Sequence, residues 1–124
     1  MKQKIIEIEN FREGKHKLVA VPVRTVKSKF VLYVDDFNDL MALGVSPHWH
    51  FYHDQAIVRN NGKEISIARL IRDARANQIV LATDGNPFNL RRENLVIAPG
   101  SSKFRARDII TKPYKTNIHI KHAH

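Results

Sequence analysis

The alternation of apolar and polar positions predicts strands along most of the first half of the chain. Residues 4–10 alternate well enough for a strand, and the apolar-rich residues 16–24 and 29–35 predict two more. Between residues 49 and 67, two further β-rich runs flank Asn-Asn-Gly at 60–62, which favours a tight hairpin turn. One helix interrupts this β-rich half. Asp36 is expected to cap a helix over 37–43, and Gly44 is expected to end it.

The second half combines helical and β patterns around a polar loop. A short helix is predicted over 68–76, with arginines every third position along one stripe. Strands are predicted over 78–83 and 95–98, on either side of a long ordered loop. Ser101 or Ser102 is expected to cap a helix that runs to about residue 110, and the alternation in 117–124 adds an edge strand. The expected fold class is therefore α+β, with a strand–loop–strand–helix (ββα) unit near the C-terminus.

Composition limits the functions that this fold can serve. A chain of 124 residues with 43% hydrophobic content suits one compact folded domain. The absence of cysteine excludes disulfides, thiolate metal sites and cysteine nucleophiles. No apolar run is long enough for a bilayer span, and the acidic residues near the start argue against a signal peptide. These features predict a cytoplasmic protein with no membrane partner.

The charge is strongly positive and unevenly distributed. Of the net charge of +9, residues 1–62 carry nine basic and seven acidic side chains, and residues 63–124 carry twelve and five. Positive charge concentrated in one half is typical of a protein that binds a polyanion such as nucleic acid. A merely solubilising basic surface is the alternative.

The polar loop carries the most specific pattern. Residues 84–95 read Asp-Gly-Asn-Pro-Phe-Asn-Leu-Arg-Arg-Glu-Asn-Leu, preceded by Val-Asp-Asp-Phe at 34–37, a tryptophan at 49 and Ile-Ala-Arg-Leu-Ile at 67–71. In this order and spacing they resemble the HNH endonuclease family, in particular small phage and bacterial proteins related to homing endonucleases. The resemblance covers roughly residues 31–107. It implies an HNH-like domain over 31–111 that ends in a ββα-metal (HNH) module. An N-terminal β extension over 1–30 is expected to precede this domain, and a basic, histidine-containing tail over 112–124 is expected to follow it.

The resemblance also implies where catalytic groups should stand, and this chain lacks them. The family's general-base histidine falls at Ala82, the metal-binding aspartate at Leu81 and a second ligand, an asparagine, at Lys103; the histidine of the preceding helix falls at Ala68. An alanine methyl cannot take a proton, and leucine cannot coordinate a hard cation. We therefore expect a pseudonuclease with no catalytic residue, no metal and no cofactor.

What remains of the module is expected to bind duplex DNA. The predicted contacts are the basic side chains of the second half: Arg69, Arg72, Arg91, Arg92, Lys103, Arg105 and Arg107. The loop itself is expected to be architectural, through Gly85, Pro87, Asn89 and Asn94. Lys103 is also a candidate to replace a metal's charge opposite a phosphate, with an ordinary exposed lysine as the alternative. Such a protein would be a phage regulatory factor acting in the host cytoplasm.

Two other functions stay open. A small phage protein with this fold could inhibit a host protein complex, such as RNA polymerase, a restriction nuclease or a CRISPR effector. An active nuclease with relocated ligands, drawn from His48, His50 or Asp84, is the weaker alternative.

Other histidines and acids have simpler explanations. His48, His50 and His53, with Asp54, do not follow a usual zinc spacing and are interpreted as surface side chains around a buried Trp49. Asp35 and Asp36 are adjacent carboxylates that helix capping explains better than acid–base chemistry. The tail histidines are interpreted as a solvated extension: His119, His122 and His124.

Overall fold

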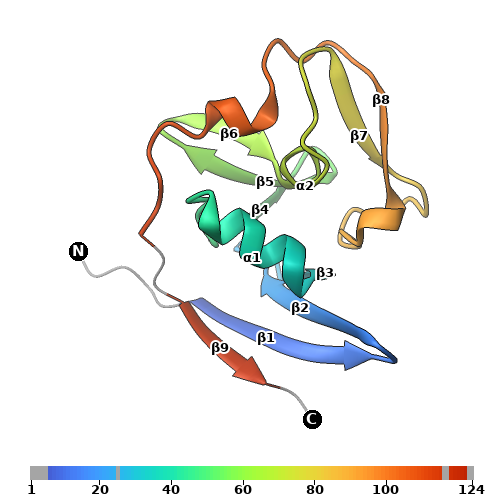
Figure 1. Ribbon diagram of the computed structural model, residues 1–124, viewed down its shortest axis with the longest axis vertical. Helices are drawn as coiled ribbons and strands as arrows, with labels where there is room; N and C mark the ends of the chain where they lie inside the picture. Colours follow the sequence, from blue (N-terminus) through green and yellow to red (C-terminus); the bar gives the residue numbers. More distant parts are fainter. Residues whose placement is uncertain (1–5, 25, 116–117, 123–124) are drawn as a thin grey trace.

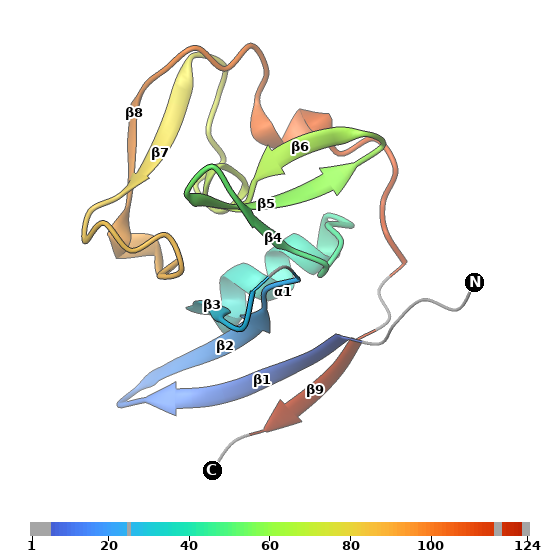
Figure 2. The ribbon, with the colours of Figure 1, turned by 180° about the vertical axis from the view of Figure 1, so that it is seen from behind.

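The computed structural model describes residues 6–24, 26–115 and 118–122 and has an α+β fold. In Figures 1 and 2 the helix α1 (Val34–Ala42) lies between two sheets. One sheet has the order β3 (Lys29–Tyr33), β2 (His16–Pro22), β1 (Ile6–Glu13) and β9 (Ile118–His122). The other contains β4 (His50–Tyr52), β5 (Gln55–Asn60) and β6 (Lys63–Ser66), followed by α2 (Ile67–Ile71). A separate hairpin joins β7 (Gln78–Ala82) to β8 (Leu95–Pro99).

The predicted strands are confirmed wherever the structure describes them. β1, β2 and β3 form an antiparallel meander, and β9 pairs in parallel with the outer side of β1. The predicted edge strand is thus present over Ile118–His122, whereas residues 117, 123 and 124 lie outside the described residues. The four-stranded sheet therefore combines strands from all three segments expected from the sequence: 1–30, 31–111 and 112–124.

The predicted hairpin over 49–67 is a three-stranded meander. Its first run is divided into β4 and β5 by a turn at His53 and Asp54, which both have positive φ. The second turn, at Asn61 and Gly62, is the predicted one and also has two positive φ angles, as a two-residue type I′ turn requires. The sequence did not distinguish the first turn because neither of its residues is a glycine.

Helix α1 begins earlier than expected. Its N-cap is Tyr33, which makes no capping bond through its side chain, so the prediction that Asp36 caps the helix is wrong. Asp36 instead lies in the first turn, is 9% exposed and accepts a bond from Arg92. A carboxylate there is stabilised by the positive end of the helix dipole as well as by the guanidinium. Gly44 ends the helix with a φ of +86°, as predicted.

The helix predicted over 68–76 is only five residues long. α2 begins with a cap from Ser66, whose hydroxyl accepts from the Arg69 amide, and it ends at Ile71. Asp73 and Asn77 then adopt positive φ, which a continuing α-helix does not permit. The predicted arginine stripe therefore does not form.

The helix predicted after Gly100 is wrong. Residues 101–105 form no regular secondary structure, and only a short 3₁₀ segment, η2 (Ala106–Ile109), follows. Tertiary hydrogen bonds have taken the backbone groups that a helix would pair internally: the Ser102 carbonyl accepts from Asn77, and the Ala106 amide donates to the Ala74 carbonyl. The C-terminal helix of a ββα unit is therefore absent from the described residues.

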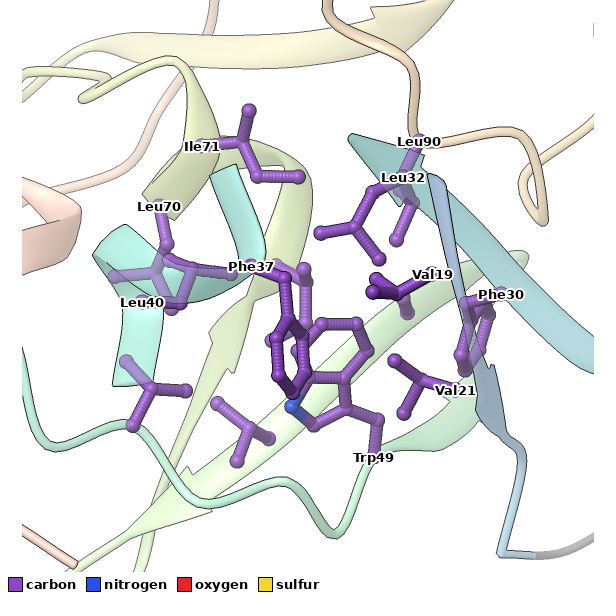
Figure 3. Close-up of a cluster of buried hydrophobic side chains, with 14 of the residues drawn as sticks. Val19, Val21, Phe30, Leu32, Phe37, Leu40, Trp49, Leu70, Ile71 and Leu90 are labelled. Atoms are coloured by element: carbon purple, nitrogen blue, oxygen red, sulfur yellow. The ribbon is translucent and has the colours of Figure 1, made fainter. Parts of the chain in front are cut away.

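Trp49 lies at the centre of the core (Figure 3). It is fully buried, its indole nitrogen donates to the Ser46 carbonyl at 2.7 Å, and Phe30 and Phe37 lie against it with ring centroids 6.2 Å away. Aromatic pairs at such distances prefer tilted geometries like these. Because Phe30 comes from β3 and Phe37 from α1, Trp49 joins the first sheet, the central helix and the start of the second sheet.

Candidate nucleic-acid interface

The polar loop between β7 and β8 is held by an internal network centred on Asn94. The Asn94 amide nitrogen donates to the Asp84 carboxylate at 3.0 Å and to the Asn89 carbonyl at 2.9 Å. Its amide oxygen accepts from Thr83 and from the Asp84 backbone. Asn94 is 6% exposed, so these bonds replace water at a buried amide. The Asn94 side chain thus satisfies both backbone and side-chain groups of the loop.

Asp84 is the second centre of this network. Its carboxylate accepts from the Asn89 side chain at 3.0 Å and from the Asn86 backbone at 2.8 Å. The bond from Asn89 is the main cause of a pKa below the usual value for this carboxyl. Gly85 has a φ of +73°, which confirms the turn that the sequence predicted there. An Asp84 held in this way is a loop constituent, although its exposure leaves it open to solvent.

The loop is fixed to the edge of the four-stranded sheet. Val31 of β3 donates its amide to the Phe88 carbonyl at 2.9 Å and accepts from the Leu90 amide at 2.8 Å. The Phe88 ring stacks between Phe30 and Phe51, with centroid distances of 5.2 and 4.8 Å, and follows the half-buried Pro87. The loop therefore continues the first sheet beyond β3, and its outer side faces solvent as a rigid element.

The two loop arginines make ion pairs within the fold. Arg91 pairs with Glu13 at the end of β1 and also donates to the Asn89 side chain at 3.2 Å. Arg92 pairs with Asp36 at 2.7 Å and donates to the carbonyl of Ile71 at 3.1 Å. These contacts fasten the loop to β1, α1 and α2. Each guanidinium lies opposite a carboxylate, so little net positive charge remains at these two positions.

The arginines after β8 are similarly occupied. Arg105 makes two bonds to the Asp73 carboxylate, at 2.9 and 2.6 Å, and they lower the pKa of Asp73 and raise that of Arg105. Arg107 donates to Asp39 at 2.7 Å and to the Leu70 carbonyl at 3.1 Å. Both hold the C-terminal segment against the body of the protein.

Arg69 is buried and Arg72 is partly buried. Arg69, 8% exposed, donates to the carbonyls of Gln78, Arg75 and Phe104 at 2.8–3.0 Å. It thereby connects α2, β7 and the segment after β8. The Nε atom of Arg72 is buried and has no hydrogen-bond partner within the described residues. Lys103 is the one lysine among the seven side chains predicted to contact DNA. It is exposed and forms no ion pair with another described residue.

The lysines show the opposite behaviour. All seven ion pairs between described residues use arginine. The lysines whose side chains the structure describes are all exposed: Lys15, Lys17, Lys27, Lys29, Lys63, Lys103, Lys112 and Lys115. Most arginines thus stabilise the fold, and most of the uncompensated positive charge is carried by lysine; Arg12 and Arg75 are exposed exceptions that form no ion pair with another described residue.

Three of these lysines border the loop, and we call them the lysine arc: Lys15, Lys17 and Lys29. Lys29 lines a groove together with Asn86 and Arg91, and no carboxylate lines it. Lys15 and Lys17 line a second groove, which Tyr33 and Arg92 share with them and which also contains Asp35 and Asp36. Sequence reasoning did not single out the lysine arc, because only the attachment of the loop to β3 brings it near the loop.

The two grooves lie at opposite ends of β3. Lys29 begins that strand and Tyr33 ends it, so at about 3.3 Å per residue they are roughly 13 Å apart. The loop is attached at Val31, midway between them. At the Tyr33 end the hydroxyl donates to Glu93 at 2.6 Å, which raises the pKa of Tyr33 and lowers that of Glu93.

The positions expected to be catalytic in the resembling family lie on and after the hairpin. Leu81 is 53% exposed, Ala82 is half-buried at the end of β7, and Lys103 is in the segment after β8. Ala68 packs against the core within α2. None of these side chains can bind a hard cation or take a proton at neutral pH.

The histidines around Trp49 have structural contacts. The Nδ1 atom of His48 accepts from the guanidinium of Arg24 at 3.0 Å, and its Nε2 atom is hydrogen-bonded to the hydroxyl of Tyr114 at 3.1 Å. Burial is the main cause of the lowered pKa of His48 and of His50. Within the described ranges no three His, Asp or Glu side chains come together in a way that could hold a metal ion. Of the tail histidines, His119 and His122 belong to β9, and His124 lies outside the described residues.

Comparison with known proteins does not identify a family for this chain. No protein-family model, curated protein or solved structure matches it. Among the residues that the structure describes, no helix is long and apolar enough to cross a membrane.

Proposed function

We propose that this protein binds duplex DNA without cleaving it, through the lysine arc and the loop between β7 and β8. The observation that carries the proposal is that arginine and lysine side chains have different environments in this fold. Most arginines are paired with carboxylates or carbonyls of the fold, whereas the exposed lysines carry most of the excess charge. Lysine is a flexible point charge that suits phosphate contacts, which supply affinity without sequence readout.

The spacing of the grooves supports duplex DNA as the ligand. The ends of β3 are roughly 13 Å apart, close to the width of about 12 Å of the major groove. Lysines at either end can therefore meet the two phosphate backbones, with the rigid loop facing the groove between them. The pairs Arg91–Glu13 and Arg92–Asp36 cancel the nearest carboxylates, which leaves Asp35 as the main exposed acid of the second groove.

The resemblance to HNH endonucleases supports DNA binding without cleavage. A nuclease must hold DNA before it cuts, and here the expected base and metal ligands are Ala82, Leu81 and Lys103. The missing helix after Gly100 would have carried the last of these positions. Loss of the ligands together with the element that presents one of them supports binding as the retained activity, in keeping with a phage regulatory factor.

The proposal is tested by the salt dependence of binding to a labelled duplex, with magnesium present in a parallel series. Each neutralised phosphate contributes about −0.9 to the slope of log affinity against log salt. The triple variant Lys15→Gln/Lys17→Gln/Lys29→Gln is expected to reduce the steepness by about 2 to 3 units. The wild-type protein is expected to leave supercoiled plasmid intact with magnesium, manganese or zinc.

A matched control has the same loss of charge elsewhere: the triple variant Lys63→Gln/Lys112→Gln/Lys115→Gln. It is expected to keep most of the slope. An equal effect of both triples would show that net charge alone is responsible and would overturn the assignment to the lysine arc. A flat salt dependence in the wild type would favour the rival function, inhibition of a host protein complex. Plasmid nicking that disappears in Asp84→Ala would favour the active nuclease.

A further inference from the structure

One face of the β7–β8 hairpin is apolar and uncovered. Leu81 and Val96 are paired across the two strands and are 53% and 45% exposed. Because side chains alternate along a strand, they share this face with the next pair, Ile79 and Ala98. We call these four residues the hairpin face. The opposite face of the hairpin packs on the core through Val80 and Leu95, so the hairpin face points outward.

The segment after β8 covers only one end of the hairpin face. Gly100 lies so close to Ile79 that a Cβ there would be 2.3 Å from the isoleucine Cγ2 atom. The chain then continues to Arg105 without regular secondary structure instead of forming the expected helix. Leu81 and Val96 therefore stay exposed towards the loop end of the hairpin.

The hairpin is also uncharged and has unpaired edges. Neither β7 nor β8 contains a charged residue, although 27% of the chain is charged. In the described part of the chain the two strands pair only with each other. Natural edge strands usually carry lysine or other charges that discourage association, and this hairpin has none.

We infer that the hairpin face binds a second copy of this chain in a twofold-symmetric dimer. Nucleic acid does not suit this face, because it offers no cation to a phosphate. Two copies with a net charge of +9 repel each other over most of their surfaces, and the uncharged hairpin is where they can approach without bringing like charges together.

The pairs of the hairpin face are suited to twofold contact. Each pair sets a larger side chain beside a smaller one: Ile79 beside Ala98, and Leu81 beside Val96. A twofold axis parallel to the strands, running between two stacked hairpins, places each larger side chain over the smaller one of the other copy. Such isologous contact is self-complementary, and the alternation of large and small side chains lets the faces interdigitate.

The dimer has a consequence for DNA binding that rests on the proposed function. The loop that connects β7 to β8 lies at one end of the hairpin (Figure 1). An axis parallel to the strands brings both loops to the same end of the dimer. Two lysine arcs could then contact one duplex, as in dimeric DNA-binding proteins. The dimer itself is argued from the hairpin alone and stands if DNA binding fails.

The first test is the molar mass of the full chain in solution, measured by light scattering or sedimentation from about 1 to 300 µM. The wild type is expected to reach twice the mass of 14.3 kDa within this range. Leu81→Lys is expected to raise the dissociation constant at least ~10-fold. The control Val26→Lys introduces the same charge at another exposed valine, 47% exposed, and should leave the dimer intact. A wild type that stays monomeric, or a dimer that Leu81→Lys leaves unchanged, would overturn the inference.

A second test determines the arrangement. Because the chain has no cysteine, a single introduced cysteine can form a disulfide only between copies. When Leu81→Cys and Val96→Cys chains are mixed and oxidised, the disulfide between the two variants is expected to form in a higher yield than the disulfide that either variant forms with itself. Thermal unfolding of each variant, compared with the wild type, verifies that the protein is folded. Disulfide formation no faster than in Val26→Cys would contradict the twofold contact.

Discussion

Replacing Arg69 tests whether the fold uses its arginines as internal connectors. In Arg69→Met the aliphatic stem is retained and three hydrogen bonds to carbonyls of residues 75, 78 and 104 are lost. Hydrogen bonds to a charged group are worth about 1.5–3 kcal/mol each, and the cost of burying the guanidinium offsets much of their sum. We expect a net loss of about 3 kcal/mol in the free energy of unfolding.

The corresponding shift in melting temperature follows from the size of the protein. At about 2.1 cal/mol/K per residue, a chain of 124 residues has an unfolding entropy of roughly 0.26 kcal/mol/K. A loss of about 3 kcal/mol then lowers Tm by ~11 °C, which differential scanning calorimetry or circular dichroism measures directly.

Arg75→Met is the matched control for this experiment. Arg75 is exposed, and its side chain makes no hydrogen bond to another described residue, so its replacement should change stability by no more than about 0.5 kcal/mol. Equal effects of the two substitutions, or an unchanged Tm in Arg69→Met, would refute the structural role of Arg69. If the Arg69→Met protein is fully stable but binds DNA more weakly, Arg69 would instead be a DNA-contacting residue, as the sequence predicted.

Three further substitutions or conditions test the contacts that hold the loop and the C-terminal segment. Asn94→Asp puts a second carboxylate beside Asp84, so the variant should lose about 2–3 kcal/mol at pH 7 and recover part of it near pH 4 in urea titrations. The lowered pKa of His48, due chiefly to burial and then to Arg24, means that the unfolded chain binds more protons than the folded chain as the pH drops below the ordinary pKa of 6.5. Stability present above that pH should therefore fall below it, and His48→Phe should flatten this dependence. Gly44→Ala should be destabilising by at least ~1 kcal/mol in the same titrations, because φ is +86° and the new Cβ would lie 2.5 Å from the C-terminal segment; an alanine as stable as the glycine would contradict the close contact.

The loss of stability in more acidic solution has a separate origin. Carboxylates with lowered pKa values, including Asp73, Asp84 and Glu93, contribute stability above their ordinary pKa values of 3.8 and 4.5 and lose it in more acidic solution. The histidine effect therefore begins at a higher pH, just below 6.5, than the carboxylate effect. Lowered stability only below pH 4.5 would contradict the role of His48.

The strands were predictable because local sequence patterns mark them. β3 and the start of β1 bury alternate positions, whereas β2, β7 and β8 are largely continuous apolar runs. The Asn94 network was also predictable, since short amides near a glycine commonly satisfy the backbone of an ordered loop. These features depend on neighbours within about ten residues.

The helix predicted after Gly100 failed because long-range contacts determine that segment. Its carbonyls and amides bond to residues 69, 74 and 77, and no local signal in the sequence reveals those partners. The same applies to Arg69, which periodicity put on an exposed stripe with Arg72 and Arg75. Tertiary context overrode helix propensity in both places.

The residues of the candidate interface differ from those predicted from the sequence for the same reason. Sequence position placed the DNA contacts on arginines of the second half, since charge is concentrated there. Folding brings Glu13 and Asp36 from the first half against Arg91 and Arg92 and leaves the lysine arc exposed. Net charge predicted a polyanion partner, but only the three-dimensional pairing of charges indicates which side chains are available to it.

The most direct test of the central claim is a titration of the ¹⁵N-labelled protein with a short duplex, followed by amide chemical shifts. Binding through the lysine arc predicts that the largest changes fall in 15–17, 28–31 and 84–92, and that they weaken together as salt is raised. Residues 61–64 and 112–115 carry exposed lysines too, and should change little. Changes concentrated in those two segments, or no saturable change at all, would contradict the account.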